Sequence, residues 1–116
     1  MVVDDSRIQE VQVRSMVKDT DYEVAAYCRD GESAVESYDT VKPDVVTMDI
    51  IMPGMDGLET TRALLEDHPE ARIIMVSSLA YDDTFDEARS IGAKGFLDKP
   101  FSREQLLAAL DKALED

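Results

Sequence analysis

The sequence predicts an α/β fold in which five βα units, (βα)5, build a doubly wound five-stranded parallel sheet. Apolar runs rich in β-branched residues alternate five times with helical patterns along the 116 residues. These runs do not alternate apolar with polar residues, so both faces of the sheet should be covered. Helical crossovers between them imply parallel strands with right-handed connections. The length suits a single domain, 1–116.

The first unit begins with the apolar run Met1–Val3, which predicts the end of a strand. A helix is expected over Arg7–Val17, with Ser6 or Asp5 available as its N-cap. The apolar run Val24–Cys28 predicts the second strand. A central strand normally has about 5–6 residues. The N-terminal strand therefore looks truncated, and it should be weakly paired.

The second helix is expected over Glu32–Tyr38, directly after the turn pair Asp30-Gly31. The segment Lys42-Pro43-Asp44 interrupts the pattern, and Val45–Met48 then predicts the third strand. The next loop, Met52–Gly57, is dense in residues that favour turns.

The third helix is expected over Leu58–Asp67, because Pro69 cannot continue it. Arg72–Val76 predicts the fourth strand. The pattern Asp83–Ile91 predicts a helix, and Gly92 is well suited to end it.

The last unit combines a short strand, Gly95–Leu97, with a helix over Arg103–Leu114. Ser102 is a suitable N-cap for that helix, and its leucines repeat at helical spacing. In a doubly wound sheet, ligands bind at the carboxyl ends of the strands. Functional side chains should therefore follow directly after the predicted strands.

Composition limits the classes of function. The chain is 44% hydrophobic and 33% charged, and its net charge is −14. Such a surface repels nucleic acid and anionic lipid. No apolar run approaches the ~20 residues of a membrane span, and no export signal is visible. Cys28 cannot form an internal disulfide and is expected to be buried, so a cytoplasmic location is expected.

Polar side chains do gather at the predicted strand ends. Three carboxylates, two hydroxyls and one ammonium follow strands one, three, four and five: Asp4, Asp5, Asp49, Ser77, Ser78 and Lys99. Two carboxylates at 4 Å repel by about 4 kcal/mol at an effective dielectric of 20. Mg²⁺ relieves this repulsion because it prefers oxygen ligands. A divalent cation, Lys99 and Ser77 would neutralise a transferring phosphoryl group, which Asp49 would attack.

These residues resemble a known family. The pair Asp4-Asp5, the run Met48–Gly57, Ser77 and the segment Lys99-Pro100-Phe101 are similar to the motifs of response-regulator receiver domains. The resemblance covers essentially the whole chain. It implies the flavodoxin-like strand order 2-1-3-4-5. It also implies a cis peptide between Lys99 and Pro100.

The resemblance implies a role for each motif residue. Asp49 would be the phosphoacceptor, supplied by a sensor histidine kinase or another phosphohistidine protein. Asp5 would ligate Mg²⁺ directly, Asp4 mostly through water, and Ile51 through its backbone carbonyl. Ser77 would be the switch hydroxyl, Lys99 would contact the phosphoryl group, and Phe96 would be the switch aromatic.

Phosphorylation is expected to pull Ser77 inward and to let Phe96 rotate. The last strand and the helices on either side of it would then change shape. An output protein or a second copy of the chain would recognise this face. Its candidate contact residues are Arg89, Lys94, Asp98 and Arg103.

Two positions depart from many relatives. Ile51 and Leu79, two residues beyond Asp49 and Ser77, are apolar where relatives often carry a polar group. Apolar side chains there would shield the acyl phosphate from water, so a long-lived phosphorylated state is expected. Phe96 stands in place of a common tyrosine, and its ring can be buried without an unmet hydrogen bond.

Three other functions compete with this interpretation. A haloacid-dehalogenase phosphohydrolase would need an aspartate at Ile51. A flavodoxin-like cofactor binder would need a phosphate-binding loop where Asp4-Asp5 stand. A degenerate receiver would act as an interaction module only. The complete set of key side chains disfavours the third alternative, although the short first strand keeps it open.

Overall fold

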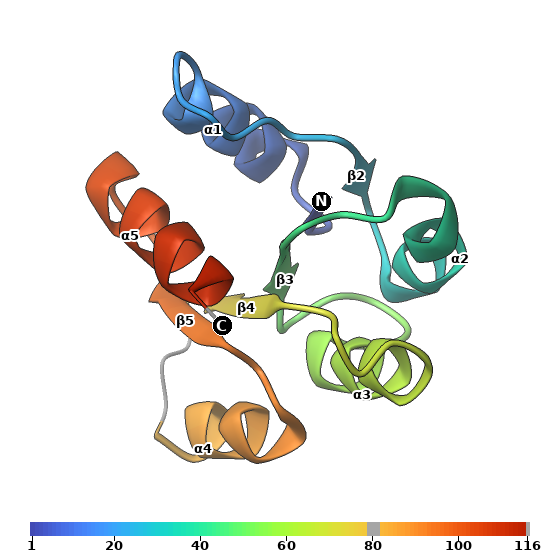
Figure 1. Ribbon diagram of the computed structural model, residues 1–116. Coiled ribbons are helices and arrows are strands. Elements are labelled where there is room, and N and C mark those ends of the chain that lie inside the picture. Colours follow the sequence, from blue (N-terminus) through green and yellow to red (C-terminus); the bar gives the residue numbers. More distant parts are fainter. Residues whose placement is uncertain (79–81, 116) are drawn as a thin grey trace.

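The computed structural model describes residues 1–78 and 82–115. Its strands are β1 (Val2–Val3), β2 (Tyr27–Cys28), β3 (Val46–Asp49), β4 (Ile73–Ser77) and β5 (Gly95–Asp98). Its helices are α1 (Arg7–Val17), α2 (Gly31–Val41), α3 (Gly57–Asp67), α4 (Asp82–Ile91) and α5 (Arg103–Leu114). Strands and helices alternate as the sequence predicted (Figure 1).

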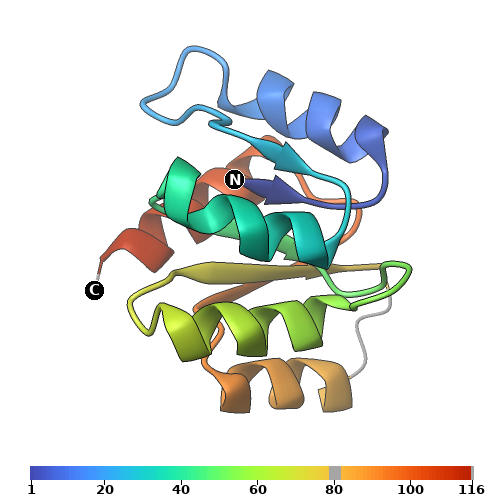
Figure 2. The same ribbon diagram turned by 90° about the vertical axis from the view of Figure 1, so that its right-hand side faces the viewer.

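The sheet has the order β2-β1-β3-β4-β5, and every neighbouring pair is parallel. The predicted α/β class and strand order are thus confirmed. In Figure 2 the strands point the same way, and the loops that leave β1 and β3 turn at the same edge. Residues far apart in the sequence are brought together along this edge.

Helices cover both faces of the sheet, so two hydrophobic cores form. One core joins the sheet to α2, α3 and α4 through buried residues such as Ala34, Leu64 and Ala88. The other joins it to α1 and α5 through residues such as Val13 and Leu106. Successive residues of one strand feed opposite cores, which explains why the strands are apolar throughout.

The strand β1 is short, but both of its neighbours pair with it. The Val2 amide donates to Ala26 O at 3.0 Å, and the Thr47 amide donates to Met1 O at 3.0 Å. The predicted strand Val24–Cys28 is too long, because β2 contains only Tyr27–Cys28. β2 lies at the edge of the sheet and forms its backbone hydrogen bonds only with β1. Because β1 pairs with it at only two positions, β2 is equally short.

Several element ends differ from the prediction by a few residues. The strands β3, β4 and β5 each run one residue further and so include Asp49, Ser77 and Asp98. The helix α2 continues to Val41 and ends where Lys42 adopts a left-handed conformation, φ 49°. The next residue, Pro43, has a fixed φ and no backbone N–H, so the helix cannot continue through it.

The helix ends use different caps. Ser102 caps α5 and forms a reciprocal capping box with Gln105. Ser6 occupies the N-cap position of α1, but its side chain makes no capping hydrogen bond. Its backbone amide instead donates to Asp4 Oδ1 at 2.8 Å, which ties the start of α1 to the site edge. Within the described residues, no helix is long and apolar enough to cross a bilayer.

Candidate functional site

Three carboxylates meet at the carboxyl edge of the sheet. One oxygen each from Asp4, Asp5 and Asp49 lies within 4.8 Å of the other two. Asp4 and Asp5 follow β1, and Asp49 is the last residue of β3. Asp4 is 2% exposed and Asp49 6% exposed, whereas Asp5 is open to solvent. The structure thus assembles the predicted acid cluster from two segments 44 residues or more apart in sequence.

Lys99 partly compensates these charges. Its Nζ donates to Asp4 Oδ2 at 2.8 Å and lies 3.4 Å from Asp49 Oδ1. Burial disfavours the ammonium, but the hydrogen bond to Asp4 and the charges of both acids outweigh burial and raise the pKa of Lys99. Lys99 follows β5 directly, and its peptide bond to Pro100 is cis, as the resemblance implied.

The Asp49 carboxyl is hard to ionise in this setting. Burial and the neighbouring Asp4 carboxylate raise the pKa of Asp49 to about 6, while Lys99 opposes them and Asp5 adds to them. A hard cation placed between the three carboxylates would relieve the same repulsion. The cluster therefore has the donor chemistry and the spacing that Mg²⁺ prefers.

The hydroxyls after β4 separate into one buried and one exposed group. Ser77 is 2% exposed and ends β4, and the Lys99 amide donates to its backbone oxygen at 2.9 Å. Ser78 is exposed. Ser77 therefore belongs to the buried edge, and Ser78 belongs to the surface. Leu79 lies outside the described residues.

The loop after Asp49 is held tightly against the strand. The Gly57 amide donates to Ile50 O at 2.8 Å. A Cβ at Gly57 would come within 2.1 Å of Asp49 O and 2.7 Å of Ile50 Cα, so only glycine fits there. Asp56 caps α3 by accepting from the Glu59 amide at 2.8 Å. The side chain of Ile51, by contrast, is 54% exposed.

Phe96 lies on β5 and packs against α4. Its ring centroid is 5.1 Å from that of Phe85, and the Arg89 guanidinium carbon is 5.2 Å from the ring centroid. The ring is half-buried rather than fully buried. Sequence reasoning named Phe96 and Arg89 but missed this contact, since their separation of seven residues spans a helix end and a turn.

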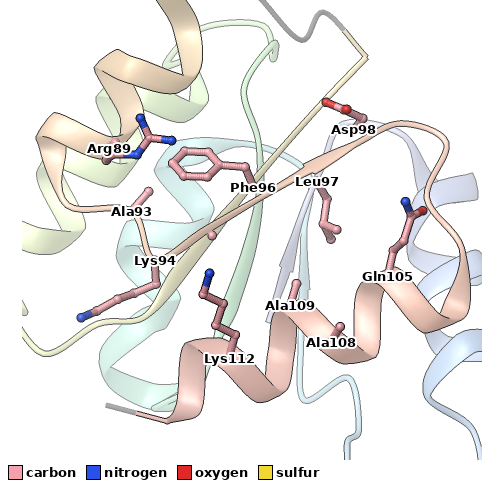
Figure 3. A pocket seen from close by; sticks show the side chains of 11 residues that line it. Arg89, Ala93, Lys94, Phe96, Leu97, Asp98, Gln105, Ala108, Ala109 and Lys112 are labelled. Atoms are coloured by element: carbon pink, nitrogen blue, oxygen red, sulfur yellow. The ribbon is translucent and has the colours of Figure 1, made fainter. Parts of the chain in front are cut away.

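Three of the four candidate contact residues line a common groove. Arg89, Lys94 and Asp98 border the space between the end of α4, β5 and α5 (Figure 3). The fourth, Arg103, points elsewhere, because its Nε donates to Met16 O at 2.9 Å. Arg103 thus links α5 to α1 and lies outside the groove lining, and its role as a contact residue stays a prediction.

A pair of exposed apolar residues was not foreseen. Ile8 is 69% exposed and Val11 59% exposed, one helical turn apart on α1. Their spacing resembles that of core residues, so the sequence alone did not separate them from Val13 and Val17. Their exposure marks the first half of α1, which starts two residues after Asp5.

The family described as the response regulator receiver domain matches residues 1–111. The chemotaxis protein CheY of Listeria monocytogenes is 42% identical over 113 residues, covering 97% of this chain and 95% of that protein.

Two solved structures share the fold. The response regulator domain of Thermotoga maritima CheB has a TM-score of 0.91 and 33% identity, covering 99% of this chain and 94% of that one. The CheX-CheY-BeF3-Mg²⁺ complex of Borrelia burgdorferi has a TM-score of 0.93 and 32% identity, covering 99% and 87%.

Proposed function

Because this chain belongs to the response regulator receiver family of two-component and chemotaxis signalling, we propose that residues 1–116 act as one receiver unit phosphorylated on Asp49. The phosphoryl donor is a sensor histidine kinase or a phosphohistidine protein, and the reaction depends on Mg²⁺ and takes place in the cytoplasm. The observation that carries the proposal is the meeting of Asp4, Asp5, Asp49 and Lys99 at one sheet edge.

Mg²⁺ fits the residues present. Asp5 would bind it directly, Asp4 mostly through water, Asp49 through a carboxylate oxygen, and Ile51 through its carbonyl. When bound, the ion would neutralise charge on the phosphoryl oxygens. The Borrelia burgdorferi CheY was solved together with Mg²⁺ and BeF3, which supports the same use of this edge.

The side chains of the chain perform the transfer. The ionised Asp49 carboxylate attacks phosphorus, the bond from phosphorus to the donor imidazole nitrogen breaks, and an acyl phosphate forms. Lys99 and Ser77 would donate hydrogen bonds to phosphoryl oxygens. The pKa of Asp49, raised to about 6, still lies below pH 7, so the ionised nucleophile is the main form at neutral pH.

The test uses a small phosphodonor. Incubation with acetyl phosphate and Mg²⁺ should add one phosphoryl group to the intact protein, as measured by mass spectrometry. Asp49→Ala should show no gain, and chelation of Mg²⁺ should prevent it. Asp44→Asn, which changes an exposed aspartate, is the matched control and should behave like the wild type. A phosphoryl group retained by Asp49→Ala would overturn the proposal.

Phosphorylation would be transmitted through Ser77 and Phe96. Inward movement of the Ser77 hydroxyl would open space for the Phe96 ring, which now packs on Phe85 and Arg89. The face formed by α4, β5 and α5 would change, and an output protein or a second copy would bind it. Direct binding to nucleic acid or membranes is not part of this function.

We predict that two polar substitutions shorten the life of the phosphorylated state. Ile51 and Leu79 would shield the acyl phosphate from a hydrolytic water. The double variant Ile51→Asn with Leu79→Glu should lose phosphate at least fivefold faster. The decay is followed by phosphate release after removal of acetyl phosphate. An unchanged half-life would refute the shielding role.

The exposed apolar pair on α1 predicts where a protein donor docks. An apolar patch beside an active edge favours a protein partner, and Ile8 and Val11 lie one turn apart there. Changing both to Lys should slow phosphotransfer from the cognate kinase at least tenfold. Phosphorylation by acetyl phosphate should stay within twofold. Equal slowing with both donors would indicate a damaged site instead of lost docking.

A further inference from the structure

The hydroxyl of Tyr27 is buried without a hydrogen bond. Tyr27 lies on β2, and its ring packs against the core between the sheet and the helices α1 and α5. Its hydroxyl oxygen is enclosed, yet it has no partner among residues 1–78 and 82–115. A buried hydroxyl that gains no partner costs folding free energy, and a phenylalanine would fill the same space without that cost. The hydroxyl is therefore expected to have a partner in another state of the protein.

Tyr27 and Asp4 belong to the same face of the sheet. Tyr27 is paired in register with Val2 on the neighbouring strand β1, and both side chains join the same core. The Asp4 amide continues this ladder by donating to Cys28 O at 3.0 Å. Because side chains alternate along an extended segment, Asp4 shares the face of Val2, two residues closer to the carboxyl edge. Burial raises the pKa of Tyr27 most, and the Asp4 carboxylate raises it further, as expected for neighbouring groups.

Asp4 has one fixed hydrogen-bond donor and one that is shared. The Ser6 backbone amide donates to Asp4 Oδ1 at 2.8 Å. Lys99 Nζ donates to Asp4 Oδ2 at 2.8 Å but also lies 3.4 Å from Asp49 Oδ1. In the function proposed above, Lys99 turns to a phosphoryl oxygen on Asp49, and Asp4 Oδ2 then loses its ammonium. A carboxylate that is only 2% exposed needs another donor in that state.

We propose that Tyr27 is a positioning residue for the phosphorylated site, whose hydroxyl donates to the Asp4 carboxylate when Lys99 leaves it. The proposal rests on the function proposed above and adds a residue to its site. The new hydrogen bond would join an unpaired hydroxyl to a carboxylate that has just lost a donor, so both groups gain. It would hold the Asp4 side chain in place at the sheet edge.

Glu10 is the other acid whose charge raises the pKa of Tyr27, but its carboxylate is already compensated. Glu10 is buried on α1, and it accepts from Arg14 Nε at 2.7 Å, with Arg7 Nε 3.8 Å away. Both bases belong to α1 itself, so phosphorylation gives neither a reason to leave. Asp4 is therefore the acceptor that gains most from a new donor.

The test is NMR of the full chain labelled with ¹³C at the tyrosine carbon that bears the hydroxyl, because this carbon reports the hydrogen bond. The chain has four tyrosines, and Tyr27→Phe assigns the Tyr27 signal by its disappearance. Beryllofluoride with Mg²⁺ is the probe for the phosphorylated site. It should shift the signal of Tyr27 more than that of Tyr38, a buried tyrosine on α2 that packs in the other core.

Tyr27→Phe should act differently in the two states. Without metal, its midpoint in urea should equal or exceed that of the wild type, because the lost hydroxyl has no partner there. With Mg²⁺, its apparent affinity for beryllofluoride, titrated on backbone amide signals, should fall at least fivefold. A role in packing alone would lower the midpoint and leave the affinity unchanged. Tyr38→Phe is the matched control and should bind beryllofluoride within twofold of the wild type.

Two further variants identify the groups that exchange. Lys99→Met removes the ammonium from Asp4 without any ligand. In the metal-free variant, the Tyr27 carbon signal should therefore move toward its position in the beryllofluoride complex. Glu10→Gln should leave the fivefold effect of Tyr27→Phe intact, because the acceptor is Asp4.

Three outcomes would overturn the proposal. One is a Tyr27 signal that stays in place with beryllofluoride or in Lys99→Met. Another is a Tyr27→Phe variant that binds beryllofluoride as tightly as the wild type. The third is loss of the Tyr27→Phe effect in the Glu10→Gln background, since the acceptor would then be Glu10. Tyr27→Phe should still gain a phosphoryl group from acetyl phosphate, and only a wild type that gains none would refute the receiver function itself.

Discussion

Asp49→Asn should make the metal-free protein more stable while it abolishes phosphorylation. The wild-type carboxyl has its pKa raised from 3.8 to about 6, mainly by burial and by the Asp4 carboxylate. At pH 7 the ionised group is therefore unfavourable in the folded state, at about 1.4 kcal/mol for each pKa unit. Replacement by the neutral isostere should raise the free energy of unfolding by about 3 kcal/mol.

The effect must depend on pH in one direction. Between pH 3.8 and about 6 the folded protein keeps a proton on Asp49 that the unfolded chain has lost. This group therefore makes the wild type lose stability as the pH rises through that window. The advantage of Asp49→Asn should be near zero at pH 3.5 and complete by pH 7.

Urea denaturation in EDTA at several pH values measures this difference. Asp44→Asn, at an exposed position, should show no comparable gain. Added Mg²⁺ should stabilise the wild type more than Asp49→Asn, because the variant lacks one of the three carboxylates. If Asp49→Asn is no more stable than the wild type at pH 7, then the ionised Asp49 carboxylate does not destabilise the folded protein, and the prediction is wrong.

The site could be predicted from the sequence because topology forces it together. Parallel strands with helical crossovers place all strand ends at one edge, and Asp4 and Asp49 follow the adjacent strands β1 and β3. Lys99 follows β5, which is not adjacent to either strand, and its long side chain brings the ammonium to both acids. The burial of each side chain was harder to predict from the sequence. Consecutive residues of an extended segment point in opposite directions, and only the register decides that Asp4 is buried and Asp5 exposed.

Contacts made across helix surfaces were the least predictable. The placement of Arg103 against Met16 O depends on how α5 lies on α1, and no local pattern records that angle. The exposure of Ile8 and Val11 also depends on how a helix packs. The apolar residues of α1 cover a wider face than the part of the helix that contacts the sheet. The shortened β2 depends on the length of its neighbour β1, which propensity does not report.

Lys99→Met should have the opposite effect on stability to Asp49→Asn. The variant keeps an unbranched side chain one atom shorter but removes the cation 2.8 Å from Asp4 and 3.4 Å from Asp49. Breaking a buried ion pair on one side costs about 3–5 kcal/mol, because the remaining charge stays buried without compensation. Urea denaturation at pH 7.5 in EDTA should show a loss of that size, and Lys18→Met, at an exposed position, should change little.

Combining the two substitutions separates charge from packing. If repulsion between uncompensated carboxylates causes the loss, Asp49→Asn should recover about 2 kcal/mol more in the Lys99→Met background than it adds to the wild type. Lowering the pH should also reduce the cost of Lys99→Met, because protonation of Asp49 removes the same charge. The raised pKa of Lys99 keeps the wild-type ammonium charged below pH 10.5, so its contribution stays constant from pH 7 to 9. Additive effects at pH 7.5 would mean that Lys99 acts through packing, and the charge balance at this edge would not govern its stability.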